Sequence, residues 1–365
     1  MEINIKKYQW MIIVSTIFLL VIGVYMVRES SLIWSEYLYK DQEYYFKRQL
    51  IYALIGLFVF FIAIKINYKY LYKYSTIFLL VSIVLLILVL IPGVGIKRNG
   101  STSWLGFSLL TFQPSEFFKI SLILFISHYL NKEYIRTSKL KNVLPLILIM
   151  GIGFTLIMLQ PDFGTCMVLA ISVFALLYSS RLKNKWFVIF ILIGFSFIAV
   201  LIMSASYRFS RIMSFIDPFE DPLGSGFQII QSLYALGPGG LIGNLESIQK
   251  HFYLPEPQTD FIFAIFIEEF GLLGGLILLV LYGIIFYSSY MIIKNSKSLF
   301  KSFVSLGLLC LFIVQVIINL GVVIGLFPVT GITLPLISYG GSSLIVCLFS
   351  LGLIVNNNYE KDIIG

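Results

Sequence analysis

The chain has 365 residues, of which 59% are hydrophobic and only 12% are charged. Soluble domains average about 45–50% apolar and about 25% charged residues, so this composition excludes a soluble domain. The net charge of +8 would also suit nucleic acid, but in so apolar a chain it indicates attraction to anionic membrane lipids, and we expect no nucleic-acid partner.

The apolar residues form ten blocks that could cross the bilayer as helices, which takes about 20 residues for about 30 Å of hydrocarbon. The alternating pattern of a membrane β-barrel is absent, and helices satisfy their own backbone groups in lipid. We therefore predict an all-α, polytopic integral membrane protein with about ten transmembrane helices and a single domain over residues 1–365. The first block lacks a small-x-small cleavage pattern, so we expect a retained anchor. The blocks are residues 10–27, 50–66, 74–92, 115–130, 143–160, 163–180, 186–203, 261–293, 303–327 and 342–355.

The distribution of basic residues predicts the orientation. With the N-terminus in the cytoplasm, the inner segments hold sixteen Lys and Arg residues and the outer segments nine, while Lys119 lies within a span. Short cytoplasmic loops are usually enriched in Lys and Arg, so we predict that both termini are cytoplasmic. The longest loop, residues 204–259 between the seventh and eighth helices, is then extracytoplasmic, and we expect the working face there.

The first outer motif is the segment 113–119. Gln113 precedes Pro114, which suits the first position of a helix. Glu116 and Lys119 are three residues apart and share a helix face, so they can pair. Two interpretations are open: the pair simply neutralises itself, or the lysine offers a cation to an anionic substrate.

The second outer motif is the segment 160–165, a tight turn between two predicted helices. Asp162 can serve there as the turn and cap residue. Alternatively, its carboxylate faces the other outer motifs.

The long outer loop is too rich in charge, proline and glycine to be only a connector. It contains Arg208 and Arg211, several acidic residues that include Glu256, and a segment over 227–234 that could form a short amphipathic helix at the lipid interface.

Asp260 follows this loop directly. Pro255 and Pro257 favour an extended approach, and Thr259 is a suitable N-cap for the next helix. The carboxylate would then lie in the first turn, where the helix dipole alone is a sufficient reason for an acidic residue. The other interpretation is a general base, which works best when burial opposes the dipole and raises its pKa. Glu268 and Glu269 lie about two turns deeper and should face a polar interior or a hydrogen-bond partner.

The last motif is the segment 327–343 between the final two helices. Its prolines and small residues predict a broken, re-entrant element, which is tolerated only when buried in protein or lining a watery cavity. The positions that define it are Pro328, Gly331, Pro335, Ser338, Gly340 and Gly341.

Cysteine and histidine usage argues against a disulfide framework or a transition-metal site. The three cysteines, Cys166, Cys310 and Cys347, all lie in apolar blocks without CxxC spacing, and the two histidines are isolated.

In this order, the motifs resemble the SEDS family (shape, elongation, division and sporulation), which includes FtsW, RodA and SpoVE. The most specific segments read LPEPQTDFIFA, EE-x-G and PVTGITLPLISYGGSSL, and the PEPQTDF form is more similar to the FtsW and SpoVE branch. The resemblance implies a peptidoglycan glycosyltransferase in the bacterial cytoplasmic membrane that polymerises lipid II on the outer face. It also implies a class B penicillin-binding protein as the transpeptidase partner.

The resemblance further implies roles for individual residues. The family's essential aspartate corresponds to Asp260, its helix-start ion pair to Glu116 and Lys119, and its second outer aspartate to Asp162. Asp260 would take the proton of the attacking sugar hydroxyl or position the acceptor. Lys119, Arg208, Arg211 or a divalent cation such as Mg or Mn would stabilise the departing lipid diphosphate.

Two departures from the family pattern stand out. Ser103 precedes Trp104 where the family usually has arginine, and the segment after Gly240 is shorter and has fewer glycines. Two other functions also remain open: a lipid II flippase or transporter, for which we find no convincing inverted repeat, and a non-catalytic scaffold of the division or sporulation machinery.

Overall fold

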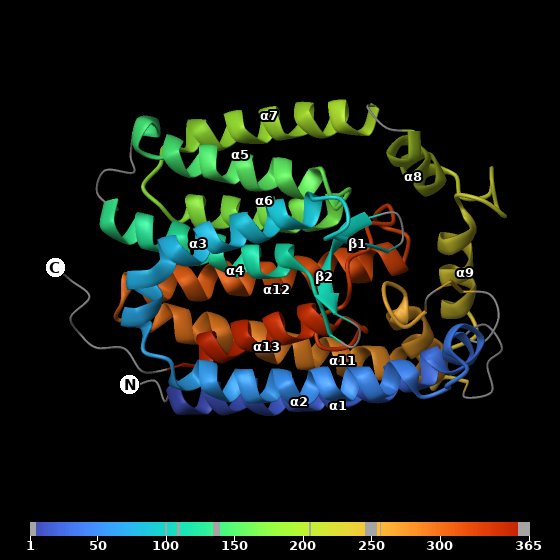
Figure 1. The fold of residues 1–365 in the computed structure, drawn as a ribbon. Coiled ribbons are helices and arrows are strands. Elements are labelled where there is room, and N and C mark those ends of the chain that lie inside the picture. Colours follow the sequence, from blue (N-terminus) through green and yellow to red (C-terminus); the bar gives the residue numbers. More distant parts are fainter. Residues whose placement is uncertain are drawn as a thin grey trace.

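Long helices that run roughly along one direction make up most of the computed structural model (Figure 1). The structure describes residues 5–98, 101–107, 110–133, 139–203, 206–244, 254–255 and 257–356. The helices are α1 (Ile5–Tyr39), α2 (Tyr44–Lys65), α3 (Tyr68–Leu90), α4 (Pro114–Glu133), α5 (Leu144–Met158), α6 (Phe163–Tyr178), α7 (Asn184–Met203), α8 (Ser206–Ile216), α9 (Phe227–Leu236), α11 (Ile262–Lys294), α12 (Leu299–Val323) and α13 (Gly341–Val355), with a 3-10 turn at Leu140–Asn142.

Each of the ten apolar blocks corresponds to one of these helices. Five of them, α1, α2, α3, α11 and α12, are long and apolar enough to cross a membrane by length and composition. The others are shorter or, like α4, carry buried charges. The polytopic helical membrane fold is therefore confirmed, whereas the total of ten spans stays a prediction.

The two ends of the described bundle differ. The start of α1 lies beside the end of α13, where Gln9 Nε2 donates to the carbonyl oxygen of Val355 at 2.6 Å. We call the opposite end, which carries α8, α9 and a small sheet, the outer end (Figure 1). The start of α1 and the end of α13 thus lie at the same end of the bundle, which agrees with the orientation predicted from the basic residues.

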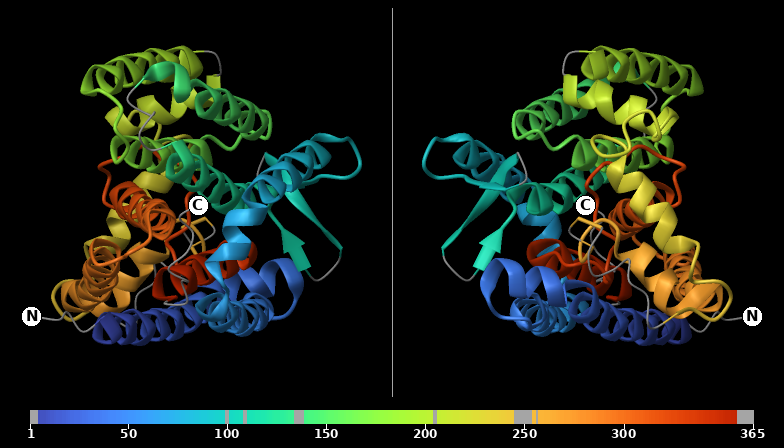
Figure 2. Two further views of the ribbon diagram at one scale, coloured as in Figure 1. Left: turned by 90° about the vertical axis from the view of Figure 1, so that its left-hand side faces the viewer. Right: turned by 90° about the vertical axis from the view of Figure 1, so that its right-hand side faces the viewer.

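The helices are not equally buried in the bundle. Viewed along the bundle, α12 and α13 lie between the pair α1–α2 and the group α4–α6, and α7 is at the margin (Figure 2). The central position of α13 explains why Leu348, Leu351 and Leu353 are fully buried although the helix has only 15 residues.

A three-stranded antiparallel sheet lies between α3 and α4 and was not foreseen. Its strands are β1 (Ile96–Arg98), β2 (Ser101–Phe107) and β3 (Leu110–Phe112), paired in the order β1-β2-β3. In β2, the buried Ser103 Oγ donates to the carbonyl oxygen of Gln160 at 3.2 Å. The serine that replaces the family's arginine thus ties the sheet to the turn between α5 and α6.

Helix α9 covers the predicted amphipathic segment 227–234, but it packs against protein. Ile229, Ile230 and Ala235 are buried against α11 and α12, and Ser232 Oγ donates to the carbonyl oxygen of Val323 at 2.8 Å. The apolar side of α9 therefore faces protein and not the lipid interface, where it was expected.

Helix α11 is broken at Gly271, where φ is 65° and ψ is −171°. The glycine-rich turn 239–244 fills the break and pairs with the backbone groups that it exposes, as buried polar groups require. Added Cβ atoms at Gly239 and Gly243 would lie 2.2 and 2.0 Å from carbonyl oxygens of α11, so only glycine allows this approach. The hydrogen bonds are Asn244 N to Glu268 O, Leu272 N to Gly240 O and Leu273 N to Leu241 O, at 2.8, 3.0 and 3.1 Å.

Candidate active site

Asp260 lies in a turn immediately before α11 and not inside the helix. The N-cap of α11 is Phe261 rather than Thr259, and the first turn contains no acidic residue. The prediction that Thr259 caps the helix is therefore wrong, and Asp260 lies one residue before the N-cap, where the positive end of the helix still favours a carboxylate. The Asp260 side chain is half-buried.

The turn is fixed by the irregular segment 324–340, which corresponds to the predicted re-entrant element. Ser338 Oγ donates to the carbonyl oxygen of Thr259 at 2.6 Å, and Tyr339 N donates to that of Gln258 at 2.8 Å. These bonds hold the backbone around Gln258 and Thr259 in a turn. The N-cap of α11 therefore lies at Phe261, two residues after the expected position.

Asn319 of α12 completes this support. Its Nδ2 lies 2.8 Å from the carbonyl oxygen of Asp260 and 2.8 Å from that of Ile332, and its side chain is only 1% exposed. Sequence reasoning missed this residue, although a lone asparagine inside an apolar block is a recognisable signal of an intramembrane polar contact.

The segment 329–333 brings three of the predicted motifs together. A Cβ atom added at Gly331, where φ is 77°, would lie 3.8 Å from Asp260 Oδ2. One added at Gly164, in the Asp162 motif, would lie 2.8 Å from the carbonyl oxygen of Thr330. Arg211 Nη1 donates to the carbonyl oxygen of Val329 at 3.1 Å.

Asp162 is the N-cap of α6. Its Oδ1 accepts from Thr165 N at 3.1 Å, and its Oδ2 accepts from Thr165 Oγ1 at 2.8 Å. Gln113 Nε2 also donates to Asp162 Oδ2 at 3.1 Å, while Gln113 N donates to Ser342 Oγ at 3.2 Å. Gln113 therefore links the motif at the start of α4 to the other two.

Glu116 and Lys119 form a buried ion pair one turn into α4. The distance from Lys119 Nζ to Glu116 Oε1 is 2.8 Å, and the two side chains are 3% and 7% exposed. Pro114 is the first residue of α4, as its sequence position indicates.

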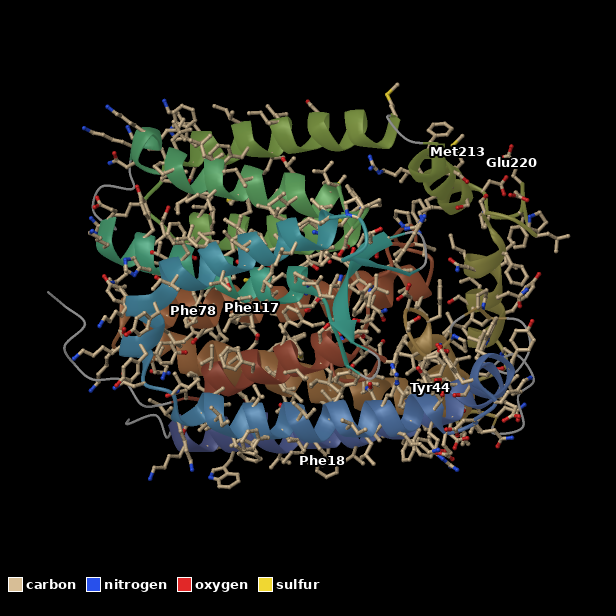
Figure 3. All side chains as sticks on the ribbon, in the orientation of Figure 1. Phe18, Tyr44, Phe78, Phe117, Met213 and Glu220 are labelled. Atoms are coloured by element: carbon tan, nitrogen blue, oxygen red, sulfur yellow. The ribbon has the colours of Figure 1, made fainter. Side chains whose placement is uncertain are left out.

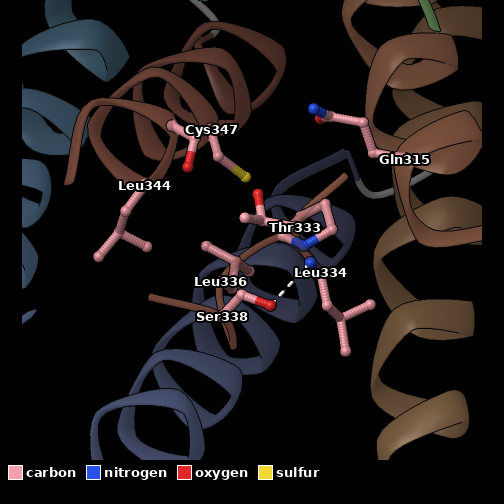
Figure 4. Close-up of a pocket in the computed structure, with 9 residues that line it drawn as sticks. Gln315, Thr333, Leu334, Leu336, Ser338, Leu344 and Cys347 are labelled. Atoms are coloured by element: carbon pink, nitrogen blue, oxygen red, sulfur yellow. Dashed lines mark hydrogen bonds between the residues drawn. The ribbon is translucent and has the colours of Figure 1, made fainter. Parts of the chain in front are cut away.

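The ion pair lines a small cavity between α4, α12 and α13. A second small space lies beside Thr333 and Ser338 of the re-entrant segment (Figure 4). Gln315, Ser343 and Cys347 line both spaces, so the ion pair and the re-entrant segment share neighbouring side chains.

The other predicted residues of the re-entrant segment make contacts within the protein or form part of its irregular backbone. Tyr282 OH donates to the carbonyl oxygen of Pro335 at 2.6 Å, Gly340 precedes α13, and Gly341 packs against the ring of Tyr52. Pro328 belongs to the same irregular segment and is half-buried.

Four further acidic or basic residues were predicted to belong to the site. Glu268 and Glu269 are buried in α11 just before the break at Gly271. Arg208 is half-buried on α8, one turn from Arg211. Glu256 lies outside the described residues.

The comparisons with known proteins all match the same family. The family model for FtsW, RodA and SpoVE, described as "Cell cycle protein", matches residues 9–363. The chain is 44% identical to Stage V sporulation protein E of Bacillus subtilis (strain 168) over 349 residues, which cover 95% of each chain. It is 37% identical to "Probable peptidoglycan glycosyltransferase FtsW" of Thiomicrospira cyclica over 369 residues, covering all of this chain and 95% of the relative.

Two solved structures are also similar. One is described as "Structural coordination of polymerization and crosslinking by a peptidoglycan synthase complex"; its matching chain has a TM-score of 0.79 and 30% identity, with 95% of this chain and 96% of that chain covered. The other is the rod shape determining protein RodA of Thermus thermophilus, with a TM-score of 0.68, 26% identity and 95% coverage of both chains.

Proposed function

The chain belongs to the FtsW/RodA/SpoVE family, and from this membership together with the site around Asp260 we propose that it is a peptidoglycan glycosyltransferase. It is a multi-pass protein of the bacterial cytoplasmic membrane. Its substrate in this proposal is lipid II, which it polymerises into glycan strands at the outer end of the bundle. The similarity to Stage V sporulation protein E favours a role in sporulation.

The observation that carries the proposal is the placement of Asp260. Its turn is held by contacts from α12 and from the segment 324–340, and its carboxylate lies beside Gly331 outside the helix. The helix dipole alone would not require these tertiary contacts around Asp260. A side chain positioned by the tertiary structure and half-open to its surroundings suits a group that contacts a substrate.

The reaction needs a base and a site for the leaving group. A sugar hydroxyl attacks the anomeric carbon of the lipid-linked sugar, and a new glycosidic C–O bond forms while the C–O bond to the diphosphate breaks. We assign the hydroxyl proton to the Asp260 carboxylate, and the bonding electron pair leaves with the lipid diphosphate.

Positive charge near the leaving group would favour bond cleavage. Arg211 uses one N–H group on Val329, and its remaining N–H groups are directed to no described acceptor, so it suits an oxygen of the diphosphate. Arg208 lies on the same helix. Lys119 is already neutralised by Glu116 in a buried setting, so we assign that pair to positioning the side chains around its cavity rather than to binding the diphosphate.

A divalent cation would fit only as an ion shared with the substrate. Among the described residues, no three His, Cys, Asp or Glu side chains come together to hold a metal. Mg²⁺ is usually bound by one or two carboxylates together with substrate phosphates, and Asp260 is the carboxylate that we would assign to it. Chelation of the assay, followed by return of Mg²⁺ or Mn²⁺, tests this assignment.

We further propose that a class B penicillin-binding protein is the partner. Support comes from the similarity to a chain of a complex whose description pairs polymerization with crosslinking. Crosslinking of peptide stems is a separate transpeptidase reaction, which this division of labour gives to the partner.

The test supplies fluorescent lipid II to the purified chain, alone and with the co-expressed transpeptidase, and separates the products on a gel. The proposal expects glycan strands with the complex. If the complex binds lipid II and forms no strands, while a known polymerase does so in the same assay, the enzymatic proposal is wrong.

A further inference from the structure

Helix α8 carries a ridge of exposed apolar side chains. Phe209, Met213 and Ile216 follow the spacing i, i+4 and i+7, which places them on one face of the helix. They are 50%, 42% and 69% exposed. Water contact with three large apolar groups in a row is unfavourable unless another apolar phase covers them.

Among the residues that the structure describes, none covers this ridge, because α8 contacts them through its other side. Arg211 reaches Val329 on the segment that holds Asp260. Ser214 is 5% exposed, and Phe215 packs against the core. The ridge of Phe209, Met213 and Ile216 therefore lies on the side of α8 that faces away from these contacts.

The position of α8 directly after α7 determines its depth relative to the membrane. Only residues 204 and 205 separate it from α7, one of the predicted spans. On α7, Val188, Leu192 and Ile193 are 57%, 62% and 60% exposed, as expected for side chains that face lipid, and Met203 at its outer end is 82% exposed. Figures 1 and 3 place α8 directly beyond that end of α7, at the margin of the bundle.

We propose that α8 is an interfacial helix whose ridge inserts into the outer surface of the bilayer. Its apolar face follows the outer end of α7 and contains no charge, which suits acyl chains and the inner part of the headgroup layer. Acidic residues begin only after its last turn, at Asp217, Glu220 and Asp221. Glu220 lies farther from the bundle than Met213, toward water (Figure 3).

This placement has a consequence that rests on the proposed function. The helix that is seated in the lipid surface also carries Arg208 and Arg211. It would hold both guanidinium groups at the height of lipid headgroups, which is where the diphosphate of a lipid-linked sugar lies.

The inference can be tested without any activity. Met213→Cys and Ile216→Cys variants of the full chain are spin-labelled, reconstituted in phosphatidylglycerol and phosphatidylethanolamine vesicles, and compared for collision with oxygen, which concentrates in lipid, and with a water-soluble nickel chelate. Leu192→Cys serves as the lipid-facing control and Glu220→Cys as the water-facing control. The unsubstituted chain measures labelling of its own cysteines, of which Cys166 is buried and the other two are half-buried.

The proposal expects labels at 213 and 216 to match Leu192→Cys, with oxygen collisions severalfold above those at Glu220→Cys and few nickel collisions. Labels that match Glu220→Cys would overturn it. Labels shielded from both reagents would also overturn it, because a protein surface, such as a second copy of the chain, would then cover the ridge. Because no substrate is present, these results are independent of whether the chain polymerises lipid II.

Discussion

Asn319 and Asp260 are joined by a 2.8 Å hydrogen bond from the side-chain amide of the first to the carbonyl oxygen of the second. The same amide nitrogen lies 2.8 Å from the carbonyl oxygen of Ile332. One buried side chain of α12 thus fixes the distance between the proposed base and the segment that runs beside it. Small displacements of a catalytic group can reduce rates about 100-fold, so this contact should matter for chemistry as well as for stability.

Replacing Asn319 with leucine should therefore lower both properties. Each buried carbonyl left without a donor costs about 1–3 kcal/mol. We expect a lower unfolding temperature and a loss of polymerisation that appears mainly in kcat, measured with lipid II and the partner complex. Ser82→Ala is the control, because the bond that Ser82 Oγ makes among the described residues is a local one, to Leu79 O within α3. A folded Asn319→Leu protein with wild-type kcat would show that Asp260 does not depend on this support.

The buried ion pair should respond differently to single and double substitution. Lys119→Met leaves the Glu116 carboxylate uncompensated, and breaking a buried pair costs about 3–5 kcal/mol. The double variant Glu116→Gln/Lys119→Met should regain most of the stability, yet polymerise poorly because the side chains around the cavity of the pair are altered. Thermal unfolding and the gel assay measure the two effects.

The ion pair of Lys47, in α2, and Asp41, in the loop before α2, provides a control for these substitutions. Its side chains are 60% and 40% exposed, so Lys47→Met should change stability very little. If Lys119→Met is as harmless as Lys47→Met, the buried pair does not contribute as the structure indicates.

The break in α11 should tolerate no side chain at Gly271. Its φ of 65° is unfavourable for other residues, and an added Cβ would lie 2.5 Å from backbone atoms of Leu241 and Gly243. Gly271→Ala should destabilise the protein by at least about 1–2 kcal/mol, the usual penalty of a strained backbone. Gly283→Ala, at a position of α11 where an added Cβ meets nothing within 4 Å, should be neutral or slightly stabilising. Equal unfolding temperatures for the two variants would contradict the observed break.

Ser103 should not accept the arginine that is usual in the family. The side chain is 1% exposed and bonds to Gln160 O and to Ser101, so Ser103→Arg would force a guanidinium into a packed site. We expect a lower unfolding temperature, whereas Ser103→Thr, which keeps the hydroxyl, should remain close to wild type. A stabilised and more active Ser103→Arg protein would mean that the sheet rearranges readily.

The sequence predicts the features that depend on long apolar runs and specific motifs. The ten hydrophobic blocks correctly place α1 to α7 and α11 to α13, and Pro114 correctly marks the start of α4. The start of α11 could not be predicted, because Ser338 and Tyr339, about eighty residues away, hold the turn that Thr259 would otherwise have capped. Local capping preferences lose to tertiary hydrogen bonds of this kind.

Other features were missed because their signals are short. The strands β1 and β3 have three residues each, too few for a recognisable alternation. The break at Gly271 depends on a turn thirty residues earlier, and no local pattern distinguishes this glycine from Gly274 or Gly275. Asn319 and the amphipathic spacing of α8, by contrast, were visible in the sequence and could have been used.

The central claim is that the Asp260 carboxylate takes part in forming the glycosidic bond, and Asp260→Asn tests it most directly. Asparagine preserves the size of the side chain and every backbone contact of the turn, so unfolding temperature and lipid II binding should stay near wild type. In the partner complex, the account predicts that glycan synthesis from fluorescent lipid II falls at least about 100-fold, the usual range for loss of a general base. Glycan synthesis at the wild-type rate by a folded Asp260→Asn protein would contradict it.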